Sequence, residues 1–153
     1  MRQLELMIPP LALCAVFAAA IVALGYFAPF ANAPFPAHRA VAIALLLIGF
    51  ALAATGVIQF RISKTTVNPM VPSRASSIVT SGVFSISRNP MYVGMALSLL
   101  GVAAWRSSVP GYVLVPLFCL YMTEFQIKPE ERILLARFGE EFSTYMSKVR
   151  RWV

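Results

Sequence analysis

A run of chemically active residue types stands where a polar segment of this chain becomes a long apolar one. It reads Arg88-Asn89-Pro90-x-Tyr92-x-Gly94. Asn and Pro suit the start of a helix, Tyr favours a membrane interface and Gly lets helices approach closely, so a helix start explains each residue alone. It does not explain why they coincide. The free N–H groups of such a start also form a ready site for a carboxylate or phosphate.

Acidic residues form a second cluster after the next apolar run. Glu124 stands inside that run, where an ionisable group is costly and usually faces a cavity, so we expect it near a site. The alternative is that it lies at the end of the span and extends its carboxylate to water. Glu130 and Glu131 follow Pro129. At a helix start they would complement the helix dipole, whereas in a site they would accept hydrogen bonds from the hydroxyls or ammonium group of a cofactor.

The elements that position these residues are membrane helices by composition. Of the 153 residues, 59% are hydrophobic and 12% charged, against roughly 25% charged in a soluble domain. Apolar runs at residues 6–27, 40–60, 91–105 and 109–125 predict four transmembrane helices. Only Arg106-Ser107-Ser108 separates the last two, which predicts a tight hairpin.

The predicted fold is therefore all-α and integral to the membrane, with a C-terminal amphipathic cytoplasmic helix after the fourth span. That helix carries large apolar residues along one side. They are Leu134, Phe138, Phe142, Tyr145 and Val149.

The distribution of basic residues predicts the orientation in the membrane. All 13 Lys and Arg residues except Arg39 and Arg106 lie before the first span, between the second and third, or after the fourth. The positive-inside rule then places both termini in the cytoplasm. The formal net charge of +7 is mostly this topology signal, with attraction to anionic membrane lipid; nucleic acid is not an expected partner.

Metal chemistry is not expected from this sequence. The single histidine, His38, lies in the first loop, and there is no Cys-x-x-Cys pair. Cys14 and Cys119 fall inside predicted spans, where we expect them to act as small apolar fillers.

From residue 65 to residue 153 the chain resembles small bacterial members of the isoprenylcysteine carboxyl methyltransferase and phospholipid methyltransferase superfamily. The order and spacing of several short elements carry the resemblance. They are Thr65-Thr66-Val67-Asn68-Pro69, Ile78-Val79-Thr80-Ser81-Gly82, the motif that begins at Arg88, Glu130-Glu131 with Ile133-Leu134, Phe138-Gly139, Tyr145 and Arg151-Trp152.

The resemblance implies a single methyltransferase domain over residues 1–153, in a bacterial inner membrane, that binds S-adenosylmethionine from the cytoplasm. Residues 1–60 would form two N-terminal spans and residues 61–153 the cofactor-binding core. Arg88 and Arg151 are the candidates for holding substrate. The residues implied to bind the cofactor are Ser76, Ser77, Ile78, Val79, Phe84, Asn89, Pro90, Tyr92 and Glu131.

Three positions depart from the pattern of the family. Eukaryotic carboxyl methyltransferases have His where Asn89 stands, and both side chains can donate one hydrogen bond. Those enzymes also carry an Arg four residues before the second Glu, proposed to hold the substrate carboxylate. Ile127 occupies that position here, so a prenylcysteine carboxylate is not the expected substrate. Phe142 stands where relatives often carry Tyr.

The sequence thus predicts S-adenosylmethionine-dependent methyl transfer to a small lipophilic acceptor that enters from the bilayer. A carboxylate or thiolate acceptor needs no base, whereas an amine or hydroxyl needs one, and Glu124 and Glu130 are the catalytic candidates. Two alternatives stay open. One is an NADPH-dependent membrane reductase related to sterol reductases, which carry a similar Arg-x-Pro-x-Tyr-x-Gly ending. The other is a non-enzymatic membrane protein whose motifs only cap helices.

Overall fold

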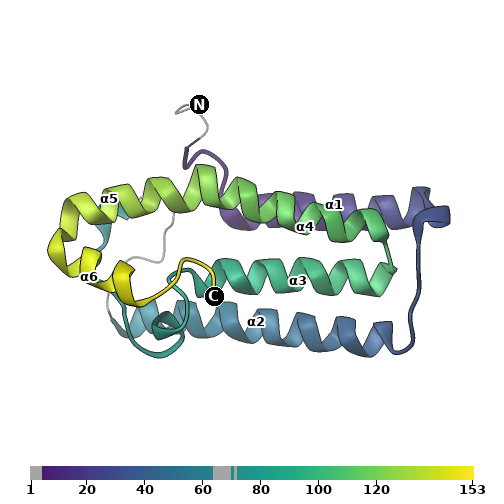
Figure 1. The fold of residues 1–153 in the computed structure, drawn as a ribbon, viewed down its shortest axis with the longest axis horizontal. Coiled ribbons are helices and arrows are strands. Elements are labelled where there is room, and N and C mark those ends of the chain that lie inside the picture. The colour runs from purple at the N-terminus through teal and green to yellow at the C-terminus, as the bar shows by residue number, and fades with distance from the viewer. Residues whose placement is uncertain (1–4, 64–69, 71) are drawn as a thin grey trace.

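The computed structural model describes residues 5–63, 70 and 72–153. Arg2, Lys64 and the expected element at 65–69 lie outside them. Every regular element within these ranges is helical, which confirms the all-α prediction (Figure 1). The elements are α1 (Pro10–Phe27), α2 (His38–Ile62), α3 (Pro90–Arg106), α4 (Val109–Tyr121), a π-helical segment (Met122–Ile127), α5 (Lys128–Phe138) and α6 (Glu140–Lys148), with 3-10 turns at Pro29–Ala31, Pro72–Arg74 and Gly82–Ser85.

Helices α1 to α4 run side by side as a bundle, and α3 packs against the other three (Figure 1). Its buried side chains, among them Tyr92 and Leu99, meet Ile21 of α1 and Phe118 of α4 in one apolar core. Because α3 is central to this core, the residues at its start are held in place from several sides.

Glycines bring α2 and α3 into backbone contact. A Cβ added at Gly94 would lie 2.5 Å from the carbonyl oxygen of Gly49, and a Cβ at Gly49 would lie 2.6 Å from the carbonyl oxygen of Gly94. Real Cβ atoms do not approach other atoms so closely. The close approach expected of Gly94 is therefore present, and it is made with α2.

The predicted hairpin between the third and fourth apolar runs is confirmed. Helix α3 ends at Arg106, and Ser107 takes a left-handed conformation with φ of 52° that reverses the chain. The Ser108 side chain then caps α4 by accepting a hydrogen bond from the backbone N–H of Gly111. Both serines are buried, so the turn is part of the packed end of the bundle.

Helices α1 and α2 are long and apolar enough to cross a membrane. Only 22% and 17% of the residues in their most apolar stretches are buried, so they are not core helices of a soluble domain. Large side chains such as Leu11 and Phe50, 71% and 74% exposed, cover their outer faces, as suits a surface in lipid. Helices α3 and α4 are shorter, 17 and 13 residues, and their crossing of the membrane stays a prediction.

The fourth apolar run does not end where the acidic pair begins. Helix α4 passes through the π-helical segment into α5 without a break (Figure 1), so Pro129 and the two glutamates that follow it lie inside a continuous helix. Pro129 and both glutamates do lie in the first turn of α5, as a helix start predicts, but that turn follows the π-helical segment directly and has no free end. Proline has no N–H for the carbonyl group four residues earlier, and that carbonyl, of Phe125, instead accepts a hydrogen bond from the backbone N–H of Leu6 at 2.9 Å.

The single C-terminal amphipathic helix expected from the apolar stripe is two helices. Gly139 separates α5 from α6 with φ of 53° and ψ of −122°, a conformation that only glycine adopts readily. The chain reverses there, so that Phe142 and Tyr145 of α6 pack near Leu134 of α5. The stripe residues do gather in one cluster, but across a turn.

Candidate functional site

A cavity lies at the end of the bundle where α3 begins. Its walls come from the end of α2, the segment 72–84, the start of α3, and helices α5 and α6. The cavity measures about 120 Å³, whereas one buried water needs roughly 10–15 Å³. It therefore has room for a ligand group and not only for a single water.

The C-terminal segment lies across the start of α3. The backbone N–H of Arg88 donates to the carbonyl oxygen of Arg150 at 2.9 Å, and the side-chain amide of Asn89 donates to the carbonyl oxygen of Arg151 at 3.0 Å. Asn89 precedes α3, but its side chain makes no capping hydrogen bond. Capping by the Asn89 side chain, the simplest reading of that residue, is thus wrong, because its amide secures the other end of the chain.

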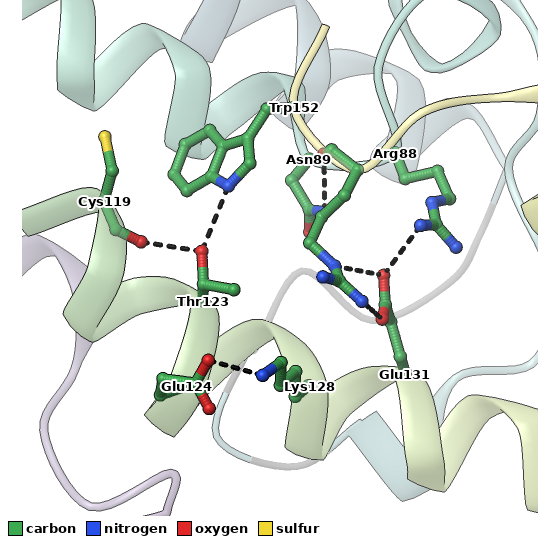
Figure 2. Close-up of polar contacts among 9 residues, drawn as sticks. Arg88, Asn89, Cys119, Thr123, Glu124, Lys128, Glu131 and Trp152 are labelled. Atoms are coloured by element: carbon green, nitrogen blue, oxygen red, sulfur yellow. Dashed lines mark hydrogen bonds and ion pairs between the residues drawn. The ribbon is translucent and has the colours of Figure 1, made fainter. Parts of the chain in front are cut away.

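Trp152 fixes the same segment on its other side. Its indole N–H donates to the hydroxyl of Thr123 at 3.1 Å, and that hydroxyl donates to the carbonyl oxygen of Cys119 at 2.7 Å (Figure 2). The last residues of the chain therefore bridge α3 and the π-helical segment.

Glu131 lies between two guanidinium groups. Arg151 binds both carboxylate oxygens, at 3.1 Å through Nε and 2.6 Å through a terminal nitrogen. Arg88 approaches one of these oxygens at 3.2 Å (Figure 2). The side chains of Arg88 and Glu131 are only 12% and 13% exposed, and hydrogen bonding to Glu131 raises the pKa of Arg151. This is a fixed cluster of charges in the cavity wall.

Glu130 is adjacent in sequence but has a different environment. The hydroxyl of Tyr92 donates to its Oε1 at 2.7 Å, and the side-chain amide of Gln126 donates to the same oxygen. Burial raises the pKa of Glu130 to about 7, against hydrogen bonds from Tyr92 and Gln126 that lower it and the nearby charge of Glu131 that raises it. Glu130 can therefore gain or lose a proton near neutral pH.

Most of the residues singled out from the sequence line this one cavity. They are Ser77, Ile78, Val79, Phe84, Arg88, Asn89, Tyr92, Glu130 and Glu131. Ser76 and Pro90 are neighbours of lining residues but do not line it themselves. Arg151 reaches the cavity wall through Glu131. Their roles in binding stay predictions.

Glu124 is not brought to the cavity. It lies in the π-helical segment with its side chain 52% exposed, and it pairs with Lys128 one turn further along (Figure 2). Glu124 does not line the cavity, because its side chain is turned to an exposed ion pair, and its catalytic role stays a prediction.

Several lining residues were not among the predicted site residues. They are Phe60, Pro72, Ala75, Met91, Leu134, Phe142 and Tyr145. Leu134, Phe142 and Tyr145 belong to the apolar stripe of the C-terminal region. That stripe could have predicted that they form a wall of the cavity. Phe60 carried no signal, because it closes a long apolar run like any other residue there. Tyr145 also donates to the carbonyl oxygen of Phe84 at 2.7 Å, which ties α6 to the far wall.

The described part of the chain combines membrane-length apolar helices with a cavity at one end of the bundle, whose mostly apolar wall holds charged side chains. This combination is typical of a membrane-embedded enzyme. Residues 37–141 match the phospholipid methyltransferase family, and the chain belongs to that family.

Two relatives give the same indication. A 121-residue stretch, 77% of this chain, is 26% identical to the protein-S-isoprenylcysteine O-methyltransferase of Schizosaccharomyces pombe and covers 50% of that protein. A protein of Haemophilus influenzae with no characterised function is 38% identical over 63 residues, its whole length and 41% of this chain. The family resemblance found in the sequence is thus confirmed. The family match and the named relative indicate a membrane methyltransferase.

Proposed function

We propose that this protein transfers a methyl group from S-adenosylmethionine to a small lipophilic acceptor that enters from the membrane. The cavity carries the proposal, because the motif that begins at Arg88 and the pair Glu130-Glu131 meet in its wall, in a chain of this family. These elements are about forty residues apart in sequence, and a role as separate helix caps does not explain their meeting.

The residues of the cavity fit the cofactor. Carboxylates such as Glu131 accept hydrogen bonds from an ammonium group or from hydroxyls. Arg88 suits a carboxylate, and its Nε is buried without a hydrogen-bond partner among the described residues. Phe84 and Phe142 are buried aromatic walls against which a purine can stack.

The protein itself would contribute the orientation of the acceptor and the exclusion of water from the site. S-adenosylmethionine supplies, when bound, a methyl group already activated on a sulfonium. The cavity walls then need only orient the acceptor and exclude water. The C-terminal segment over the start of α3 serves the second purpose, because its hydrogen bonds to Arg88 and Asn89 cover that side of the site.

The membrane supplies the acceptor in this proposal. Helices α1 and α2 expose apolar side chains along their length, and we propose that α3 and α4 with the π-helical segment complete a four-span domain. The distribution of basic residues supports a cytoplasmic position for both termini and for the cavity. A bacterial inner membrane is the proposed location.

Calorimetric titration of the detergent-purified protein tests the proposal. We expect micromolar binding of S-adenosylhomocysteine and no binding of NADPH. Glu131→Gln should weaken the first, while Glu141→Gln, an exposed acid outside the cavity, should not. Binding of NADPH alone would favour a reductase. Binding of neither ligand to folded protein would leave the motif residues as structural.

A further inference from the structure

The two adjacent glutamates of the cavity are held by opposite kinds of partner. Glu131 receives two guanidinium groups, from Arg88 and Arg151. Glu130 receives two neutral donors, Tyr92 and Gln126, and no ion pair to it is found in the described part of the chain. Adjacent titratable groups with contrasting environments commonly divide the work of a site, one as a fixed charge and one as a proton carrier.

Gln126 lies in the π-helical segment and contacts Glu130 of α5. Gln126 stands four residues before Glu130 and is 2% exposed, so both side chains point to the same inward face of the continuous helix. Wide turns of this type occur often at functional sites. Here the turn precedes Pro129, and Leu6 binds the carbonyl group of Phe125 that the proline leaves without an intrahelical donor.

We propose that Glu130 accepts a proton from the methyl acceptor, and that Gln126 is a positioning residue that, with Tyr92, fixes the Glu130 carboxylate for this transfer. The inference rests on the proposed function. It assigns the acceptor to the class of alcohols and amines, which carry a proton to lose. A carboxylate acceptor has no proton to lose, so methyl transfer to it would not need Glu130 as a base.

The step balances as follows. The acceptor's oxygen or nitrogen uses a lone pair to form a bond to the methyl carbon, the bond from that carbon to sulfur breaks, and sulfur keeps the electron pair as a neutral thioether. The acceptor's O–H or N–H proton passes to Glu130, which later releases it to water.

The charges around Glu130 are compatible with this role. Tyr92 of α3 donates to it, Glu131 lies beside it on α5, and the cations Arg88 and Arg151 are engaged by Glu131. Tyr145 of α6 lines the same cavity, but its hydroxyl is bound to a carbonyl group. Burial raises the pKa of Glu130 to about 7, and a proton acceptor works best when its pKa is near the working pH.

Three matched probes test the acceptor class. Dodecylamine, dodecanol and dodecanoate share one chain length and differ only in head group, and radiolabelled S-adenosylmethionine reports methyl transfer to each in detergent micelles. We expect transfer to the amine or the alcohol, with a rate that rises as Glu130 loses its proton, and none to dodecanoate. Transfer to dodecanoate alone, or to none of the three by protein that binds S-adenosylhomocysteine, would overturn the assignment.

The positioning role has a readout that needs no acceptor. The infrared carboxyl band that Glu130→Gln removes reports the titration of Glu130 in protein bound to S-adenosylhomocysteine. Losing a hydrogen bond to a charged carboxylate should move its midpoint up by roughly one to two pH units in Gln126→Leu. Phe125→Leu, in the same π-helical segment but outside the cavity, should leave it in place.

An unchanged midpoint in Gln126→Leu would refute the positioning role. If wild-type protein does not bind S-adenosylhomocysteine, the proposed function itself fails. These two results can be told apart, because the unchanged midpoint in Gln126→Leu is measured only in protein that binds S-adenosylhomocysteine.

Discussion

The glycine that ends the Arg88 motif offers a sharp test of how α3 is placed. In Gly94→Ala the new methyl group would lie 2.5 Å from the carbonyl oxygen of Gly49 and 3.0 Å from the backbone nitrogen of Ala53. Both contacts are backbone atoms of α2. A backbone atom cannot rotate away as a side chain can, so the two helices must separate.

A second glycine at the same interface provides the matched control. In Gly56→Ala the new methyl group meets Cγ of Met91 at 2.7 Å and no backbone atom closer than 3.8 Å. The Met91 side chain is flexible and can move aside. Both variants exchange a buried helical glycine for alanine, so helix propensity favours each by the same amount, about 1 kcal/mol.

The expected difference follows from the packing. Overfilling a packed interface costs about 1–3 kcal/mol, and sometimes more. We therefore expect Gly94→Ala to lower the free energy of unfolding by up to about 2 kcal/mol after the propensity gain, and Gly56→Ala to leave it unchanged or raise it. The two variants should differ by ~2 kcal/mol, or roughly 4–8 °C in melting temperature.

Thermal unfolding followed by circular dichroism in detergent measures this difference. Gly94 stands one helical half-turn from Tyr92, whose hydroxyl is 2.7 Å from Glu130, so Gly94→Ala should also weaken binding of S-adenosylhomocysteine. Equal melting temperatures for the two variants would refute the reasoning, because the backbone contact would then not hold α3 in place.

Three further outcomes are expected. The pKa of Glu130 is about 7 in the folded protein against an ordinary 4.5. The folded state therefore binds more protons between these two pH values, and stability falls as pH rises through them. The melting temperature of Glu130→Gln should not fall with pH in this range, and the same fall as in the wild type would contradict the assignment. Glu131→Gln leaves the guanidinium groups of Arg88 and Arg151 together without a carboxylate, and it should cost about 3 kcal/mol of stability. Arg151→Ala should cost only about 1 kcal/mol. Equal melting temperatures for these two variants would argue against a shared charge cluster. Gly139→Ala meets no atom within 4 Å but imposes a φ of 53° on alanine, and strain alone should cost about 1–3 kcal/mol; a wild-type melting temperature would show that the turn can relax.

Local patterns in the sequence were enough to predict helices α1 to α4 and to single out several residues that line the cavity. Apolar runs marked α1 to α4, and the three residues at 106–108 are too few for anything but a hairpin. Arg88, Tyr92 and Glu131 were identifiable because their types are unusual at the edge of an apolar run. These signals are local, since periodicity and turn chemistry act over a few residues.

The pairing of side chains was decided only by tertiary structure. Asn89 looked like a helix cap, yet its amide binds the carbonyl group of Arg151, 62 residues away. Glu124 and Glu130 looked equally suited to catalysis, but the path of one continuous helix turns Glu124 to an exposed pair with Lys128 and Glu130 to the cavity.

The physical reason is that a side chain's role depends on its partners, and partners depend on the rotation of each helix about its axis and on where the chain reverses. The wide turn before Pro129 and the reversal at Gly139 set both for the C-terminal third. Composition determined that this chain forms apolar helices suited to lipid. Packing determined that Glu131 became one half of a charge cluster while its neighbour Glu130 kept only neutral donors.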